Sequence, residues 1–521
     1  MIQTPKVSFH DAPTADEYLA ANKRRMRRLL LGAALLALAV GGSYVGVSLG
    51  NPALPLVLLV AIVTPVLLWR YPALATYTVF LIVCTSELQP ITPKDSFTDK
   101  LMFFMNINTI VQVYAHANFK ALPISLMELF LLVAGVISMI RAVFTRSTKL
   151  EAGKLFLPIV IYIGFVTLGW AHGVGTGGDF KISLQEVRSQ FYFLVAYLLA
   201  VNVITDMRRV TKLQWIMVLC IGLKGILYTF RRYVTMAGLP LPDQGVGSHE
   251  EAFFFDCFEA LLLVLTVAGI QPKMRTVMWI LLPTVILGNL ACNRRAATAA
   301  IAIAVILVIA AAYQALPERR KMAGIVAVAL AIGFSIYYPA FKDSSSLIGQ
   351  PARAIKSQFA PDARDASSNN YRDAENADIL ATVKLEPVLG YGYGKRMLHA
   401  VPIADISKSY EWWDILPHNN VLWVWMRVGT LGFIAFWAMI AAIIFQACAV
   451  MRIDKSDNSV KAVGMISLLF TGMLLVFGLL DLQLSNFRDM LLTGFWTGVA
   501  TAVLRMQQRP SASAPPEALS Q

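Results

Sequence analysis

The sequence predicts an all-α fold, that of a polytopic integral membrane protein. Hydrophobic residues make up 57% of the 521 positions and charged residues only 15%, whereas soluble domains carry about one quarter charged residues. The mean hydropathy is +0.61. Apolar runs recur at a length of about 20 residues, which spans a hydrocarbon core and must satisfy its backbone internally as a helix. We expect about 12–14 transmembrane helices and a large, partly helical outer loop.

Fourteen apolar segments are candidate spans in this sequence. They are 29–49, 53–69, 73–88, 122–141, 155–172, 189–205, 213–230, 252–270, 276–292, 296–313, 322–339, 430–451, 461–481 and 488–506. Residues 1–28 form a basic N-terminus, and its "KRRMRR" precedes a run too long for a typical signal segment, so we expect an uncleaved first span. Residues 507–521 form a disordered tail.

The basic residues predict the orientation of the chain. The formal charge is +13, but Lys and Arg gather in short clusters between apolar runs, a pattern typical of membrane orientation and not of a nucleic-acid partner. Alternating from a cytoplasmic "KRRMRR", every loop predicted inside carries Lys or Arg, including "DMRRVTK", "PERRK" and "RIDKSDNSVK". Both termini are therefore expected in the cytoplasm.

The organisation follows from two long outer loops, at about 89–121 and at 340–429. About eleven spans occupy 29–339, and about three occupy 430–506. Loops this long are usually functional or disordered. The segment "SSSLIGQPARAIKSQFAPDARDASSN" is expected to be irregular. The following "NYRDAENADILATVKLEPVLGYGYG" has helix-compatible spacing that stops at Pro387 and a Gly-rich turn.

Four polar side chains from three parts of the chain are predicted to meet at the outer face. Arg188 begins a span, Arg294 and Arg295 occupy a tight turn between spans, and His418 stands at the mouth of another. An arginine at a membrane surface usually faces a cavity or a partner, and the guanidinium fork suits phosphate. The alternative without a functional role is that these arginines extend to lipid headgroups, or that Glu186 pairs locally with Arg188.

His418 is a candidate general base near neutral pH, or else an interfacial polar residue or cap. Asn419 is expected to orient His418 or to cap the following helix. No phosphate-loop lysine motif and no Asp-x-Asp or His/Asp cluster is present on the outer loops, so we expect neither a metal nor another cofactor. Lys224, Asp256 and Glu259 are charged residues within predicted spans. Because such residues can form a proton or ion path, a transporter remains an alternative function.

The motifs in their order resemble the bacterial O-antigen ligase and O-antigen polymerase superfamily of membrane glycosyltransferases. The resemblance covers about residues 180 to 450 and rests on Arg188, "NRRA", Tyr371 with Arg372, "EPVLGYGYG" and "PHNNVLWVWMRVGTLG". The family usually has Ser-Arg-Gly where this chain has "NRRA", so the functional arginine is either Arg294 or Arg295.

The resemblance implies an enzyme of lipopolysaccharide or polysaccharide biosynthesis. It would sit in the bacterial inner membrane and transfer a glycan from undecaprenyl diphosphate to an acceptor glycolipid or glycan at the periplasmic face, with inversion and without a metal. We expect His418, Arg188, Arg294 and Arg295 to be catalytic, and Arg372, Tyr371, Asn419 and Glu186 to bind substrate. A lipid-linked glycan flippase or secondary transporter, or a non-catalytic assembly subunit, is the alternative.

Overall fold

The computed structural model describes residues 22–23, 26, 40–41, 54–87, 101–110, 123–145, 150–239, 245–247, 250–408, 410–453 and 457–508. These residues form helices without any strand, which confirms the predicted fold class. Most of the predicted span 29–49, most of the loop 89–121 and most of the C-terminal tail lie outside the described residues. Two units are distinguished: residues 1–75 with 130–148, and residues 76–129 with 149–521.

The helices follow one another with short connections. Their bounds are α2 Leu54–Arg70, α3 Ala73–Thr85, α5 Leu126–Thr145, α6 Phe156–Gly175, α7 Phe180–Val203, α8 Met207–Phe230, η3 Arg231–Thr235, α9 Glu251–Ala268, α10 Pro272–Ala291, α11 Arg295–Ala315, η4 Pro317–Arg319, α12 Arg320–Phe341, α13 Gln350–Phe359, α14 Ala363–Leu385, α15 Asn420–Met451, α16 Asn458–Leu480 and α17 Phe487–Gln508.

Eight segments of the described chain are long and apolar enough to cross a membrane. They are α5, α6, α8 with η3, α10, α11, η4 with α12, α15 and α16, and α2 with α3 counts as a ninth if the pair is one broken span. The predicted spans at α7, α9 and α17 are also present as helices, but each carries buried charged side chains that lower its apolar character. The chain is a polytopic membrane protein.

Small residues let the central helices of the second unit pack closely. α7 packs along α17, α15 packs against α6 and α16, α11 joins α16 to α9, and α10 packs on α8. A Cβ added to Gly494 would lie 2.5 Å from the carbonyl oxygen of Phe193, and one added to Gly498 would lie 2.5 Å from that of Tyr197. Such close backbone approach through glycine is typical of helix pairs in membranes.

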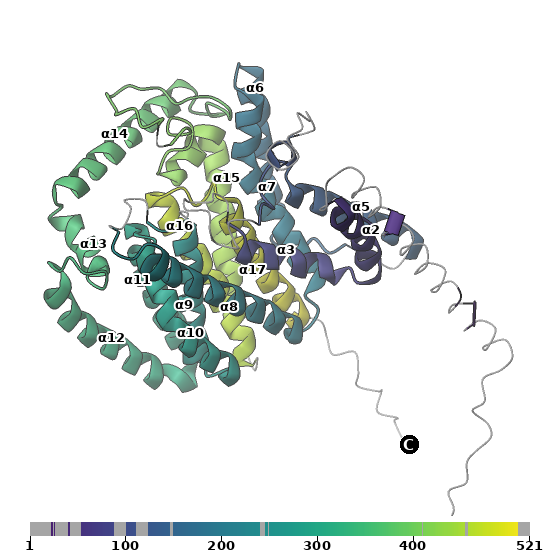
Figure 1. The fold of residues 1–521 in the computed structure, drawn as a ribbon, viewed down its shortest axis with the longest axis horizontal. Helices are drawn as coiled ribbons and strands as arrows, with labels where there is room; N and C mark the ends of the chain where they lie inside the picture. The colour runs from purple at the N-terminus through teal and green to yellow at the C-terminus, as the bar shows by residue number, and fades with distance from the viewer. Residues whose placement is uncertain are drawn as a thin grey trace, which may run out of the picture. The chain divides into compact units, whose positions relative to one another are not determined.

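The segment after α11 leaves this bundle and forms an arc along its edge, made of α12, α13 and α14 (Figure 1). Only Ala323 is buried on α12. The prediction of an irregular segment before Asn370 is wrong, because α13 and the first two turns of α14 are helical. The buried residues of α13 are Ala352, Ala354 and Ser357. Because all three are small, the sequence shows no helical repeat of large apolar residues here.

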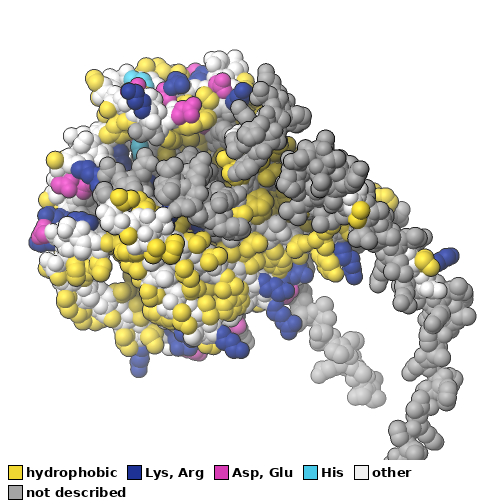
Figure 2. All heavy atoms as spheres, in the orientation of Figure 1, with side chains coloured by type: hydrophobic (Ala, Val, Ile, Leu, Met, Phe, Trp, Pro, Cys, Tyr) yellow, Lys and Arg dark blue, Asp and Glu magenta, His cyan; other side chains and the backbone are white. Residues whose placement is uncertain are grey.

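Charged and hydrophobic side chains occupy different regions on the surface of the second unit. Figure 2 shows a broad band of hydrophobic side chains, with Lys and Arg gathered at the lower end and mixed charges with histidine at the upper end. This distribution is the one expected of a bundle whose more basic end faces the cytoplasm.

A Gly-rich turn joins the loop that precedes α15 to a break in α15. Gly390, Gly392 and Gly394 have φ of 84–85°, and Gly429 inside α15 has φ 67° and ψ −178°. The Tyr391 amide donates to the Met426 carbonyl at 2.7 Å. Each φ lies where only glycine is readily accommodated, so this turn explains the glycines of "GYGYG" and the first glycine of "GTLG".

Gly429→Ala is expected to destabilise the protein by about 2 kcal/mol or more, because backbone in this region is essentially restricted to glycine. The added Cβ would also lie 2.3 Å from the Val388 carbonyl oxygen. Thermal unfolding in detergent measures the effect. Gly333→Ala in α12 is the matched control, since nothing lies within 4 Å of its Cβ position. Equal unfolding temperatures for the two variants would contradict the strain at Gly429.

Candidate functional site

One face of α14 contacts several parts of the segment between α11 and α15. Ser368, Tyr371, Glu375, Asp378 and Thr382 recur every three or four residues and therefore point the same way. Each side chain contacts a different part of the site. Ser368 accepts from Arg295, Tyr371 and Glu375 meet His418, Asp378 meets His399, and Thr382 accepts from the Leu398 amide.

His418 is held by a buried carboxylate. Its Nδ1 lies 3.2 Å from both Glu375 carboxylate oxygens, and its backbone N–H donates to the Glu375 Oε2 at 2.9 Å. The Glu375 side chain is 1% exposed, and that of His418 is 21% exposed. When Nδ1 donates its proton to Glu375, Nε2 carries the free lone pair and can accept a proton.

Sequence reasoning missed Glu375. Its position four residues after Tyr371 in a helix-compatible run is the signal that could have indicated it, because residues four apart share a helix face. Its contact with His418 spans 43 residues of sequence.

Tyr371 packs its ring edge-on to the His418 ring, with centroids 6.0 Å apart. Burial, followed by the negative charge of Glu375, raises the pKa of Tyr371. The phenol therefore stays protonated at neutral pH, and among the described residues its buried hydroxyl has no hydrogen-bond partner. This hydroxyl beside His418 is available to a ligand.

The adjacent Arg294 and Arg295 reach different groups. Arg294 Nη1 lies 3.9 Å from the carboxylate of Asp481, at the end of α16. Arg295 instead contacts α14 and α13, with Ser368 at 3.2 Å and Ser357 at 3.5 Å. Arg372 is within electrostatic range of Arg295. The structure thus brings Arg295, Arg372, Tyr371 and His418 together around α14.

Arg188 is buried in a separate set of contacts. Its Nε lies 2.9 Å from the Glu128 carboxylate, and its Nη1 donates to Gln185 at 2.6 Å and to Asn106 at 3.2 Å. It also donates to the Pro123 carbonyl. Within the described chain, these contacts of Arg188 include none to His418 or Arg294, so the predicted convergence of Arg188 with the other site residues stays a prediction.

Glu186 pairs with Arg427 and not with Arg188. Both side chains are 0% exposed, and Arg427 Nη2 lies 2.7 Å from Glu186 Oε1. Glu186 also accepts from the Gly394 amide at 2.6 Å and the Trp423 indole at 3.1 Å. Arg427 in turn donates to the carbonyls of Gly392 and Ile415. Both oxygens of Glu186 are engaged by protein donors, so its contacts fix the turn and the chain leading to His418.

The residues after His418 anchor the start of α15. The Asn419 side chain accepts from the Leu422 amide at 3.1 Å and caps the helix. The Asn420 side chain donates to the Pro417 carbonyl at 2.9 Å and accepts from the Ser485 amide at 2.9 Å. "PHNN" is thus fixed on both sides of the histidine.

Of the three charged residues predicted within spans, Lys224 has an ionic partner, and Asp256 and Glu259 share the amide of Asn289. Lys224 lies 2.5 Å from Glu251, and Asn289 donates to Asp256 at 2.7 Å. Arg488 pairs with Glu250 and Glu251. These contacts join α8, α9, α10 and α17, and a buried ionic group that has its partners tolerates the low dielectric of the interior.

Residues 260–437 match the family model described as O-antigen ligase. The matched range contains Arg294, Arg295, Tyr371, Arg372 and His418, together with the Gly-rich turn, whereas Arg188 and Glu186 precede it. The comparison with curated proteins gives no match.

Proposed function

We propose that this chain, in which residues 260–437 match the family model described as O-antigen ligase, transfers a glycan from undecaprenyl diphosphate to an acceptor hydroxyl. The transfer takes place at the periplasmic face of the bacterial inner membrane, with both termini in the cytoplasm. The acceptor is a glycolipid or another lipid-linked glycan.

The pair formed by His418 and Glu375 is the observation that carries this proposal. His418 Nε2 takes the proton of the acceptor hydroxyl, and the carboxylate at 3.2 Å from Nδ1 stabilises the imidazolium that forms. The acceptor oxygen forms a bond to the anomeric carbon as the bond from that carbon to the diphosphate oxygen breaks. The diphosphate leaves with the electron pair, and this single displacement inverts the anomeric centre.

The developing negative charge on the diphosphate requires cationic donors. Guanidinium groups bind such oxygens bidentately and stabilise charge strongly in a site that excludes water. Arg294 at the start of α11 and Arg372 beside Tyr371 are the groups we assign to this role. Arg188 stays a predicted member of the set, and Tyr371 offers its hydroxyl to the substrate.

A transfer assay tests the proposed function. The purified protein is mixed with undecaprenyl-diphosphate glycan and either a lipid A core acceptor or a second lipid-linked repeat, with EDTA present. Transfer to one acceptor with inverted linkage is the expected result, and the acceptor that reacts separates ligase from polymerase. Binding of the donor without transfer to any acceptor would overturn the proposal in favour of a transporter or assembly subunit.

Glu375→Gln is expected to lower kcat by about tenfold or more while KM changes less than twofold, because glutamine keeps an acceptor but loses the charge that stabilises the imidazolium. Steady-state transfer kinetics measure both constants. Asp373→Asn is the matched control, since Asp373 is exposed on the same helix. An unchanged kcat in Glu375→Gln would remove the carboxylate from the mechanism.

A further inference from the structure

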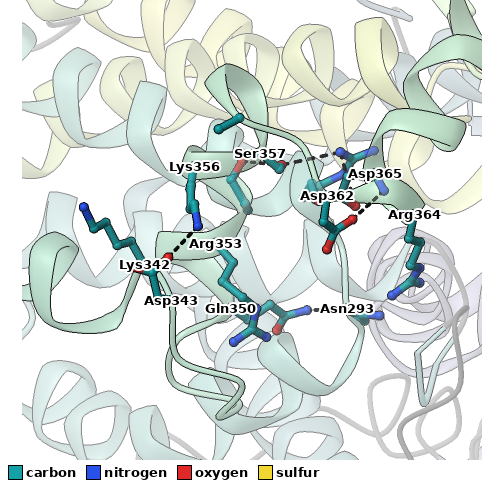
Figure 3. A pocket seen from close by; sticks show the side chains of 13 residues that line it. Asn293, Lys342, Asp343, Gln350, Arg353, Lys356, Ser357, Asp362, Arg364 and Asp365 are labelled. Atoms are coloured by element: carbon teal, nitrogen blue, oxygen red, sulfur yellow. Dashed lines mark hydrogen bonds and ion pairs between the residues drawn. The ribbon is translucent and has the colours of Figure 1, made fainter.

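A cavity of about 250 Å³ lies beside Arg295. It is open to the surface on one side and is lined by the start of α11, the residues that follow α12, α13, and the start of α14. Figure 3 shows Lys342 and Asp343 on one side and Asp362, Arg364 and Asp365 on the other.

The charged side chains around the cavity leave a positive surplus. Five are basic, namely Arg295, Lys342, Arg353, Lys356 and Arg364, and three are acidic, namely Asp343, Asp362 and Asp365, so the formal surplus is two. All three acidic groups already have protein partners, among them Asp365, which lies 3.6 Å from Arg295. Asp343 pairs with Lys356, and Asp362 accepts from the Asp365 amide at 2.8 Å. The cavity is therefore suited to an anion.

Arg295 is the first residue of α11 and lines the cavity, where its guanidinium can donate hydrogen bonds to a ligand. Its guanidinium contacts Ser368 at 3.2 Å, Ser357 at 3.5 Å and Asp365 at 3.6 Å. Charge-assisted hydrogen bonds of a guanidinium to an oxyanion are normally about 2.7–2.9 Å long. The three contacts of this guanidinium with described residues are longer than that. A ligand oxyanion can therefore form a shorter hydrogen bond with it.

We propose that this cavity binds an acidic group, a phosphate or a carboxylate, carried by the glycan or the acceptor. The inference rests on the proposed function and names a chemical class of substrate for it. Pockets for drug-sized ligands run from about 300 to 1,000 Å³, so a volume of about 250 Å³ suits one phosphate or one acidic sugar.

The position of the cavity along α14 separates this acidic group from the reacting hydroxyl at His418. Ser368, which contacts Arg295, precedes Glu375, which contacts His418, by seven residues on one helix. At 1.5 Å of rise per residue the two contacts are about 10 Å apart. The bound group therefore lies at a distance from the reacting hydroxyl, and Arg295 acts on it while Arg294 remains for the diphosphate.

Binding is tested first without turnover. The purified full-length protein in detergent is titrated calorimetrically with a hexose 6-phosphate and with the same unphosphorylated hexose. The phosphorylated sugar is expected to bind, and Lys342→Gln/Arg364→Gln is expected to weaken that binding about tenfold or more, since hydrogen bonds to charged groups contribute about 1.5–3 kcal/mol. Lys384→Gln/Lys408→Gln, which removes two exposed charges outside the cavity, is expected to leave it unchanged.

Transfer kinetics then identify the source of the acidic group. With a phosphorylated acceptor, Lys342→Gln/Arg364→Gln should raise KM about tenfold while kcat stays within twofold, and with the dephosphorylated acceptor it should match wild type. The assay is run in vesicles of neutral lipid and in vesicles containing an anionic phospholipid. If the effect of the variant depends on the vesicle lipid and not on the acceptor, the cavity binds a lipid headgroup. This result would overturn the substrate proposal.

Two outcomes keep the inference and the proposed function apart. Transfer by wild type with no difference between Lys342→Gln/Arg364→Gln and its control, on either acceptor, would sink the cavity inference and leave the glycosyltransferase standing. Absence of transfer by wild type would sink the proposed function, and the calorimetric titration would still decide whether the cavity binds an anion. Arg364→Lys, which keeps the charge, should retain binding and thereby exclude misfolding as the cause of a loss.

Discussion

His418→Ala is expected to reduce glycan transfer by about 10²- to 10⁴-fold, the usual contribution of a positioned general base. Alanine removes Nε2, the only ring nitrogen that is not directed at Glu375. The acceptor hydroxyl then has to lose its proton to water. Single-turnover transfer with saturating donor measures the loss, and donor binding should be retained because the arginines are intact.

His399→Ala is the matched control for this experiment. His399 Nδ1 also lies 3.2 Å from a carboxylate of α14, that of Asp378, and its ring stacks on Trp413 at 4.9 Å. It has the same chemistry one turn further along the helix. We expect His399→Ala to change the rate less than threefold, and equal losses in the two variants would indicate that the first acts through the fold of the loop and not through proton transfer.

Arg427→Met is expected to lower the free energy of unfolding by about 3–5 kcal/mol, because removing one partner leaves an uncompensated charge in the interior. The remaining partner is Glu186, whose side chain is 0% exposed. The substitution also frees the carbonyls of Gly392 and Ile415. The loop from the Gly-rich turn to His418 should loosen, so transfer should fall together with stability.

Thermal unfolding in detergent measures this effect against Arg452→Met. Arg452 is exposed and lies at the other end of the same helix, so its loss should change stability by less than about 0.5 kcal/mol. Adding Glu186→Gln to Arg427→Met should recover part of the loss, since the buried carboxylate is then neutral. A single variant as stable as wild type would refute the role of this ion pair.

Local pattern predicts much of this molecule. Apolar run length predicts the helical membrane fold, and helix-compatible spacing ending at Pro387 predicts α14, which ends at Leu385. The order of motifs predicts that Tyr371 and His418 lie close together, and their rings are in contact. The first two features depend on neighbouring residues, whose spacing the sequence displays directly.

Pairings across long stretches of chain have no such local signature. Trp423 contacts Glu186 across 237 residues, and Arg427 lies one turn further along α15. Nothing in the residues around Glu186 distinguishes Arg427 from Arg188 as its partner, and only the packing of α7 with the Gly-rich turn does so. α13 escaped prediction for another reason, since its buried side is made of small residues.

α14 has a consequence for the energetics of the whole site. It is a single helix of 23 residues, and its one face touches both Arg295 and His418. A ligand that orders one part of a rigid helix also restricts the other, and such coupling is reciprocal between binding equilibria. Occupation of the cavity by an anion is therefore expected to increase the affinity of an acceptor without an acidic group at His418, and that acceptor is expected to increase the affinity of the anion by the same factor.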